Sequence, residues 1–236
     1  MEITSPFDRS FVFQAMRADR AAKSSVLPSA LGHSHIGRAA SRRLEFDLGR
    51  RAALAALSEL GYSSLEIAKR ADGSPDWPAG VTGSISHTEV DGEILAVAAI
   101  TSNPSVASVG LDIERVRQVN PKLLGRIASP GEVAWANAAD TERRTIMIFS
   151  AREALYKAIV PLYRASMRYR ETVLEWADDL AGFRAVTHLP HRDGATIALT
   201  IRIVQHPKLV VAGVVLSRAN WSATAPGGSA PESPLE

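Results

Sequence analysis

The segment 107–114, A-S-V-G-L-D-I-E, restricts the folding of this chain more than any other stretch. Its apolar residues alternate with small or acidic ones, which is the pattern of a short β-strand. Asp112 and Glu114 are two residues apart, so their carboxylates point to the same face of that strand. Apolar neighbours surround both charges, and buried charges cost free energy unless they are paired or bind a metal ion. We therefore expect a cation to meet this strand in the folded protein.

The segment 149–158, F-S-A-R-E-A-L-Y-K-A, is predicted to be helical. Glu153 and Lys157 are four residues apart, so they share one face of the helix. If this face meets the acidic strand, three carboxylates and one ammonium converge. Such a group suits a magnesium–phosphate site, because carboxylates hold Mg²⁺ while a lysine neutralises the remaining phosphate charge.

Each motif also has a plainer interpretation. Asp-x-Glu can close a strand as a solvated acidic face, and Glu–Lys at this spacing is a common surface pair on helices. The apolar residues around both motifs favour the metal site, but the two interpretations stay open at this stage.

Composition restricts the possible functions. The chain has 236 residues, of which 46% are hydrophobic, so it can form one large domain or two small ones. The absence of cysteine excludes a disulfide framework and is consistent with a cytoplasmic protein. A formal net charge of +2 suits anionic ligands or an acidic partner but is not typical of a nucleic-acid-binding protein. We find no apolar run of transmembrane length and no signal peptide, so we expect a cytoplasmic monomer without a membrane partner.

The pattern of elements predicts an α/β (α+β) fold. A helix at 39–60 precedes strands at 80–88, 92–100 and 106–113, which we expect to form one antiparallel sheet under that helix. A helix at about 143–160, ending at Pro161, precedes three further strands at 173–177, 197–204 and 209–216. Residues 222–236 are rich in Gly, Ser, Ala and Pro, which predicts a disordered tail.

Three motifs, in order, resemble those of the 4'-phosphopantetheinyl transferases of the Sfp type, most closely the EntD-like branch. They are W-P-A-G-V-T-G-S-I-S-H at 77–87, G-L-D-I-E at 110–114 and F-S-A-R-E-A-L-Y-K-A at 149–158. The resemblance covers about residues 40–165. It implies two similar lobes in a pseudo-twofold arrangement, each an antiparallel three-stranded sheet packed on a long helix. The expected lobes are 1–106, on the coenzyme A side, and 107–221, with the magnesium site and the carrier-protein side.

The resemblance also implies a function. Members of this family move the 4'-phosphopantetheine group from coenzyme A to a serine of an apo acyl, aryl or peptidyl carrier protein. The reaction depends on Mg²⁺ and leaves adenosine 3',5'-bisphosphate, which is a holo-acyl-carrier-protein synthase activity. The EntD-like motifs suggest siderophore, nonribosomal peptide or polyketide synthesis. The alternative is an inactive relative that only binds coenzyme A or a carrier protein.

Roles for individual residues follow from the same resemblance. Asp112, Glu114 and Glu153 would bind Mg²⁺, and Glu153 would accept the serine proton directly or through a metal-bound water. Lys157 and His87 would offset charge on the transferring phosphate and the leaving group. The residues expected to bind coenzyme A are Arg42, Arg50, Arg70, Ser86, His87 and Lys157.

Two basic regions remain ambiguous. Arg152 stands where the family usually carries lysine; if that position relays a proton the enzyme would be slow, and if it only supplies charge nothing is lost.

The family docks an acidic carrier protein near residues 115–147, where a basic surface including Arg143 and Arg144 would fit. Taken alone, these arginines are more typical of solvated surface charges.

Overall fold

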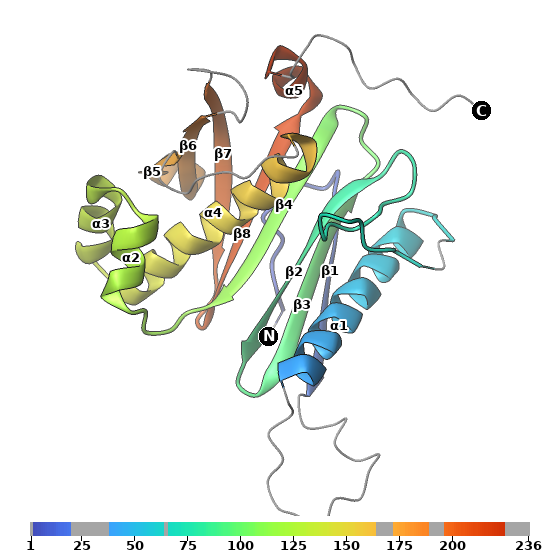
Figure 1. Cartoon of the computed structure of the whole chain (residues 1–236), viewed down its shortest axis with the longest axis horizontal. Coiled ribbons are helices and arrows are strands. Elements are labelled where there is room, and N and C mark those ends of the chain that lie inside the picture. Colours follow the sequence, from blue (N-terminus) through green and yellow to red (C-terminus); the bar gives the residue numbers. More distant parts are fainter. Residues whose placement is uncertain (1, 20–37, 64–65, 164–171, 189–195, 225–236) are drawn as a thin grey trace, which may run out of the picture.

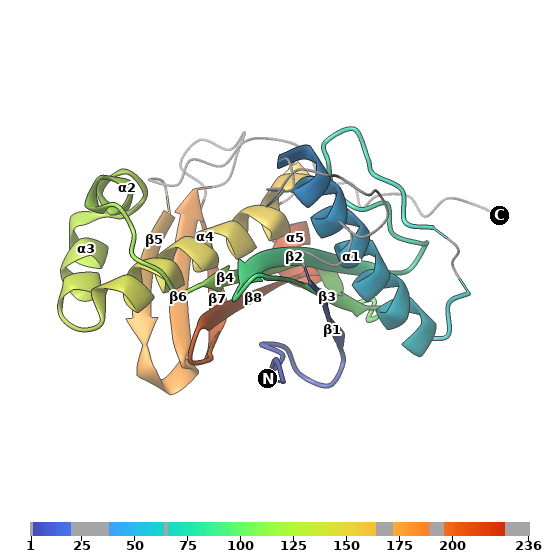
Figure 2. The same cartoon turned by 90° about the horizontal axis from the view of Figure 1, so that it is seen from below.

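Two antiparallel sheets lie side by side, and each carries one long helix on the same face (Figures 1 and 2). The computed structural model describes residues 2–19, 38–63, 66–163, 172–188 and 196–224. Its elements are β1 (Val12–Asp19), α1 (Arg38–Glu59), β2 (Thr82–Val90), β3 (Glu93–Thr101), β4 (Val106–Arg115), α2 (Pro121–Ile127), α3 (Pro130–Asn137), α4 (Thr141–Tyr163), β5 (Thr172–Ala177), the 3₁₀ turn η3 (Asp178–Leu180), β6 (Gly182–His188), β7 (Thr196–Gln205), β8 (Leu209–Ser217) and α5 (Arg218–Thr224).

The first sheet has the strand order β1-β3-β2, and α1 packs across it. The central strand β3 carries an unbroken apolar run from Ile94 to Ile100 because both its faces are buried. Leu44 and Leu48 of α1 pack on Ile94 and Ala96, so the helix is fixed by its apolar stripe. The prediction of a long helix at 39–60 is confirmed.

The second sheet has the strand order β4-β8-β7-β6-β5, and α4 packs across it. The α/β class with two antiparallel sheets is confirmed, but this sheet has five strands rather than three. The strand at 106–113 was predicted to complete the first sheet, and this was wrong: β1 takes that place, and β4 pairs along its length with β8. Strand β6 was not predicted from the sequence; its short alternation begins directly after Ala181, a residue with φ 46°.

Two predicted ends of elements differ from the structure. Helix α4 continues past Pro161 to Tyr163, because a proline in the last turn removes one hydrogen bond without ending the helix. The predicted tail at 222–236 begins too early, since α5 includes residues 222–224; residues 225–236 lie outside the described residues. The expected boundary between the lobes, after residue 106, falls at the start of β4 and stays a prediction. No described helix is long and apolar enough to cross a membrane.

Serine side chains join the two sheets where β2 lies beside β4. The amide of Leu111 donates to the Ser84 hydroxyl at 3.1 Å, and the amide of Ile113 donates to the Ser86 hydroxyl at 3.3 Å. These hydroxyls, on one strand, satisfy amides of the other that would otherwise be unpaired in the interior. We call this junction of β2 and β4 the seam.

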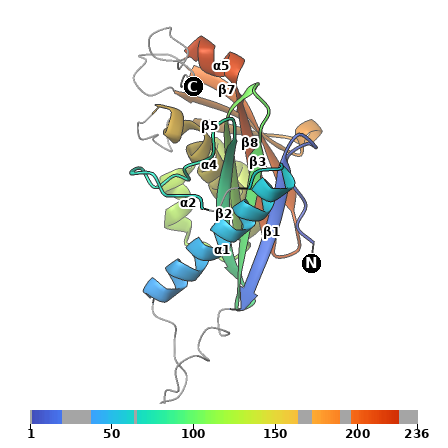
Figure 3. The ribbon, with the colours of Figure 1, turned by 90° about the vertical axis from the view of Figure 1, so that its right-hand side faces the viewer.

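The N-terminal segment covers the seam from the face opposite the helices (Figures 2 and 3). Ile3 is buried in a cluster that combines side chains of β3 with Leu111 and Ile113 of β4. Because this cluster draws on both sheets, the two lobes share a core at the seam.

Candidate active site

Helix α4 approaches strand β4 very closely at one point. Gly110 makes this possible, because a Cβ atom there would overlap the backbone carbonyl of Ala154. The contact brings the helix turn that carries Glu153 and Lys157 to the part of β4 that carries Asp112. The predicted meeting of the acidic strand and the Glu–Lys helix face therefore has a specific cause in packing.

Lys157 is the centre of a hydrogen-bonded cluster at the seam. Its ammonium donates to Asp112 Oδ1 at 2.8 Å, to Ser86 Oγ at 2.9 Å and to the carbonyl oxygen of Leu111 at 3.0 Å. The Ser86 hydroxyl donates to the same Asp112 oxygen at 2.9 Å. Three residues predicted for the site, from three different elements, thus lie in direct contact.

Asp112 has one oxygen that no described residue satisfies. The residue is 4% exposed, and its Oδ2 atom is buried without a hydrogen-bond partner among the described residues. A buried carboxylate oxygen without a partner costs free energy, so this atom is a candidate ligand for a cation.

Glu114 has an altered pKa. Burial first, and then the charge of Asp112, raise the pKa of Glu114 to about 7. The charge of Glu153 raises it further, while Arg117 and Lys157 lower it. Asp112 and Glu153 therefore both disfavour the charged form of Glu114, which is an electrostatic setting in which a cation binds favourably.

The carboxylates do not form a closed metal cage in this structure. Among the described residues, no group of three or more His, Cys, Asp or Glu side chains has the geometry to hold a metal ion. Asp112 forms an ion pair with the ammonium of Lys157 instead of lying against another carboxylate. The donor set fits Mg²⁺, which takes few protein carboxylates and completes its coordination with phosphate or water oxygens.

His87 lies beside this cluster on β2 and is close to α1. Its Nδ1 atom is 3.8 Å from Glu45 Oε2 on α1. Burial lowers the pKa of His87, while the charge of Glu45 opposes that shift. Glu45 was not predicted as a site residue; its position on the predicted helix between Arg42 and Arg50 was the available signal.

A cleft of about 480 Å³ opens next to the cluster. Lys157 and Ser84 line it together with Arg70, which also pairs with Asp76 at 2.8 Å. Its apolar lining includes Trp77 and the half-exposed Tyr156. The structure thus places the predicted Arg70 in the same cleft as Lys157.

The two arginines predicted on α1 are placed differently. Arg50 lines a separate hollow of about 870 Å³, its guanidinium lies over the Phe46 ring at 4.7 Å, and its Nε is buried without a partner among the described residues. Arg42 is exposed to solvent. Neither arginine lines the cleft of Lys157.

Three other arginines mentioned in the sequence analysis have structural partners. Arg152 is fully buried and donates to Glu132 and to backbone carbonyls of Ile127 and Thr172, away from the Lys157 cluster. Arg143 donates to the carbonyls of His206 and Pro207 in the hairpin between β7 and β8, and Arg144 lies over the Trp135 ring.

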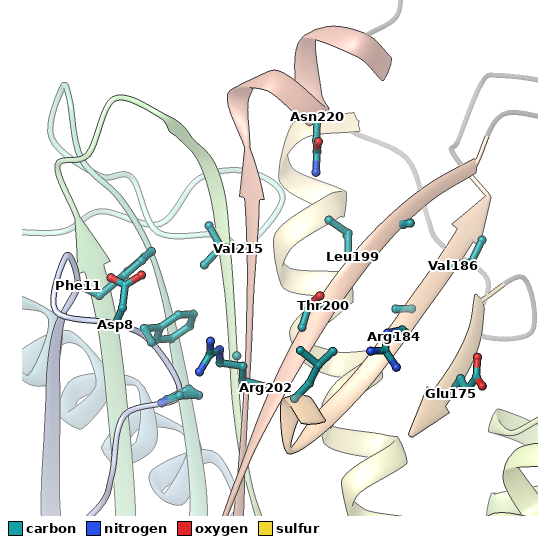
Figure 4. A pocket seen from close by; sticks show the side chains of 16 residues that line it. Asp8, Phe11, Glu175, Arg184, Val186, Leu199, Thr200, Arg202, Val215 and Asn220 are labelled. Carbon is teal, nitrogen blue, oxygen red and sulfur yellow. The ribbon is translucent and has the colours of Figure 1, made fainter. Parts of the chain in front are cut away.

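Another hollow, of about 690 Å³, lies on the face of the second sheet opposite α4 (Figure 4). Figure 4 shows Arg184 and Thr200 on neighbouring strands of this sheet. Asp8 and Phe11 of the N-terminal segment line the other side of the hollow, with Arg202 between them and Thr200. None of the predicted site residues lines this hollow. The seam is therefore the better candidate for the active site.

Comparison with known proteins gives two family matches that follow each other along the chain. A family model described as the 4'-phosphopantetheinyl transferase N-terminal domain matches residues 34–100, and one described as the 4'-phosphopantetheinyl transferase superfamily matches residues 108–212. The two matches meet near the junction of β3 and β4.

Two of the similar proteins carry the same name, and a third is named as a component of enterobactin synthase. The chain is 30% identical to the 4'-phosphopantetheinyl transferase Svp of Streptomyces mobaraensis over 66% of this chain and 64% of that protein. It is 34% identical to the 4'-phosphopantetheinyl transferase Npt of Nocardia iowensis over 55% of this chain and 57% of that protein. It is also 34% identical to enterobactin synthase component D of Escherichia coli K12 over 56% of this chain and 61% of that protein. The matched region thus spans less than two thirds of each of these relatives.

Proposed function

We propose that this chain, which belongs to the 4'-phosphopantetheinyl transferase superfamily, transfers 4'-phosphopantetheine from coenzyme A to a serine of an apo carrier protein. The observation that carries the proposal is the cluster of Lys157, Asp112 and Ser86 at the seam, beside an open cleft. It combines a cation for phosphate, a buried carboxylate oxygen for a metal ion and space for a ligand.

Asp112, Glu114 and Glu153 are the residues proposed to hold Mg²⁺. The Asp112 Oδ2 atom without a partner among the described residues, and the repulsion that Asp112 and Glu153 exert on the charge of Glu114, support this assignment. When bound, the ion supplies positive charge at the pyrophosphate of coenzyme A, as metal ions do in phosphoryl transfer.

The residues of the chain then act on the two ends of the breaking bond. Lys157 neutralises charge on the transferring phosphate, and His87 offsets charge on the leaving group as a hydrogen-bond donor. Glu153 accepts the proton of the carrier serine. A bond forms between the serine oxygen and the phosphorus that bears pantetheine, and the bond from that phosphorus to the bridging oxygen breaks. Adenosine 3',5'-bisphosphate leaves with the bridging oxygen.

The basic residues around the cleft are proposed to bind the nucleotide end of coenzyme A. Arg70 lines the cleft of Lys157, while the preceding residue, Lys69, lines the hollow of Arg50. One elongated anionic ligand could therefore reach both, and the buried Nε of Arg50 has a donor to offer to phosphate. Ser86, and Arg42 at the exposed start of α1, complete the proposed set.

The carrier would be an acyl, aryl or peptidyl carrier protein, and we propose that the enzyme acts as a monomer. One relative is named as a component of enterobactin synthase, which supports a role in siderophore synthesis. Nonribosomal peptide and polyketide carriers present the same serine chemistry and belong to the proposal.

The direct test is the intact mass of apo carrier proteins after incubation with this protein, coenzyme A and Mg²⁺. Asp112→Asn serves as the control, because it keeps the shape of the side chain and removes its charge. We expect a mass gain of one phosphopantetheine with the unaltered protein and almost none with Asp112→Asn. If coenzyme A binds but no carrier of any class gains mass, the chain is a binding relative and the proposal is wrong.

A further inference from the structure

We propose that Lys157 occupies the metal site as a resident cation, which keeps divalent ions weakly bound until an anionic phosphate ligand draws its ammonium away. The proposal deepens the function above and rests on it for the identity of that ligand, coenzyme A. It makes the binding of metal and of phosphate ligand interdependent through one side chain.

All three donors of the Lys157 ammonium are already used within the cluster. A protonated lysine has three N–H donors and no acceptor. Asp112 Oδ1, Ser86 Oγ and the carbonyl oxygen of Leu111 accept from it at 2.8, 2.9 and 3.0 Å. A phosphate oxygen can therefore gain a hydrogen bond from Lys157 only if one of these three contacts is given up.

The contact of Lys157 with Asp112 competes directly with a metal ion. The ammonium meets Oδ1 of a carboxylate whose Oδ2 is buried and lacks a partner among the described residues. A divalent ion on Oδ2 would share that small carboxylate with the ammonium, and the two like charges would repel each other at low dielectric. The ammonium thus stabilises the charge of Asp112 while it discourages a second cation.

This competition couples the binding of the metal ion to the binding of the phosphate ligand. A phosphate ligand that attracts the ammonium frees Asp112 for the metal, so each ligand raises the affinity for the other by the same factor. Phosphate oxygens can also coordinate the metal themselves, so coupling alone does not distinguish the proposal. The distinguishing quantity is the affinity of the ligand-free protein for Mg²⁺ when Lys157 loses its charge.

The experiment is calorimetric titration of the full chain, without coenzyme A, with Mg²⁺ alone. Lys157→Gln is the main variant, because its amide can still donate to Ser86 or Leu111 but carries no charge. Lys157→Met is the second variant, in case the first one reorganises the cluster. Thermal melts of both establish that they are folded.

Arg117→Gln is the matched control. Arg117 is exposed, and its charge lowers the pKa of Glu114 as that of Lys157 does, so it acts on the same carboxylates through space. We expect Lys157→Gln to bind Mg²⁺ about tenfold more tightly than the unaltered protein. Arg117→Gln should change the affinity by less than about threefold, because exposed charges are screened.

The outcomes separate this proposal from the proposed function. Equal or weaker Mg²⁺ binding by both folded Lys157 variants would overturn the resident-cation proposal, even if the unaltered protein loads carrier proteins. A gain of similar size in Arg117→Gln would also overturn it, since net charge would then explain the effect. A gain confined to the Lys157 variants supports it, even if no carrier protein is modified.

Discussion

Arg152 Nη2 lies 2.7 Å from Glu132 Oε2, and both side chains are buried. Glu132 also accepts from the amides of Leu174 and Ser129, and with Ser129 it forms the capping box at the start of α3. The pair therefore ties α4 to α3 and β5. Arg152, which the family resemblance led us to compare with a lysine, serves the scaffold here, because its guanidinium binds Glu132 and the carbonyls of Ile127 and Thr172.

Arg152→Met is expected to destabilise the protein by about 3–5 kcal/mol, because it leaves Glu132 charged and buried without its cation. The measurement is the free energy of unfolding in urea. Arg184→Met is the matched control: Arg184 pairs with Asp179 at the same distance of 2.7 Å, but both side chains are more than half exposed. Its loss should be below about 1 kcal/mol. Equal losses in the two variants would show that the buried pair has no special role.

Gly110→Ala is expected to separate α4 from β4. The added methyl group would overlap the carbonyl of Ala154, which is backbone and cannot turn aside. We expect a loss of about 1–3 kcal/mol of stability, together with loss of carrier loading as the helix that carries Lys157 moves. Gly125→Ala is the control, because nothing lies within 4 Å of the added atom. Full activity and stability in Gly110→Ala would disprove the close packing.

Local patterns were sufficient for the elements that carry the site. Alternation along 107–114 predicted β4, and the four-residue spacing of Glu153 and Lys157 predicted their shared helix face. Ser86 was found only through the family resemblance, and Ser84, its partner at the seam, was missed although the two serines alternate along one strand. Their importance comes from bonds to β4 amides 27 residues away in sequence, which no local period encodes.

Partners that are distant in sequence also explain the other differences. Arg152 and Glu153 are neighbours on α4, yet Arg152 is buried against α3 while Glu153 is only partly buried. A helix turns about 100° per residue, so adjacent charges meet different surroundings. The pairing of β4 with β8 rather than β3 depends on a strand about 100 residues later in the chain. Sequence periodicity identifies a strand but not which neighbour it will choose.

The stability of the metal-free protein is expected to fall as pH rises toward neutrality because of Glu114. Its pKa is raised from 4.5 to about 7 in the folded state, so the folded protein holds a proton that the unfolded chain has lost. This contribution to stability is complete below pH 4.5 and is lost as pH rises through about 7. Glu114→Gln removes this pH dependence, so between pH 5 and 8 the free energy of unfolding of the variant should rise by roughly 2 kcal/mol relative to that of the unaltered protein.

Urea unfolding in the presence of a chelator, repeated across that pH range, measures the difference between Glu114→Gln and the unaltered protein. Glu142→Gln, an exposed change on α4, is the control and should give a constant difference. A constant difference for Glu114→Gln as well would mean that Glu114 titrates normally.

Replacing the two serines of the seam one at a time is expected to distinguish a structural role from a catalytic role. Ser84 and Ser86 are both buried and each accepts from one β4 amide, so replacing either with alanine should cost about 1–3 kcal/mol of stability. Only Ser86 also meets Lys157 and Asp112, at 2.9 Å each. Ser86→Ala should therefore slow carrier loading about tenfold, which is about 1.4 kcal/mol in the barrier, while Ser84→Ala keeps most of the rate. The measurement is the rate of carrier loading per amount of folded protein in each variant. Equal slowing in both variants would mean that the seam, rather than the contact with Lys157, controls the reaction.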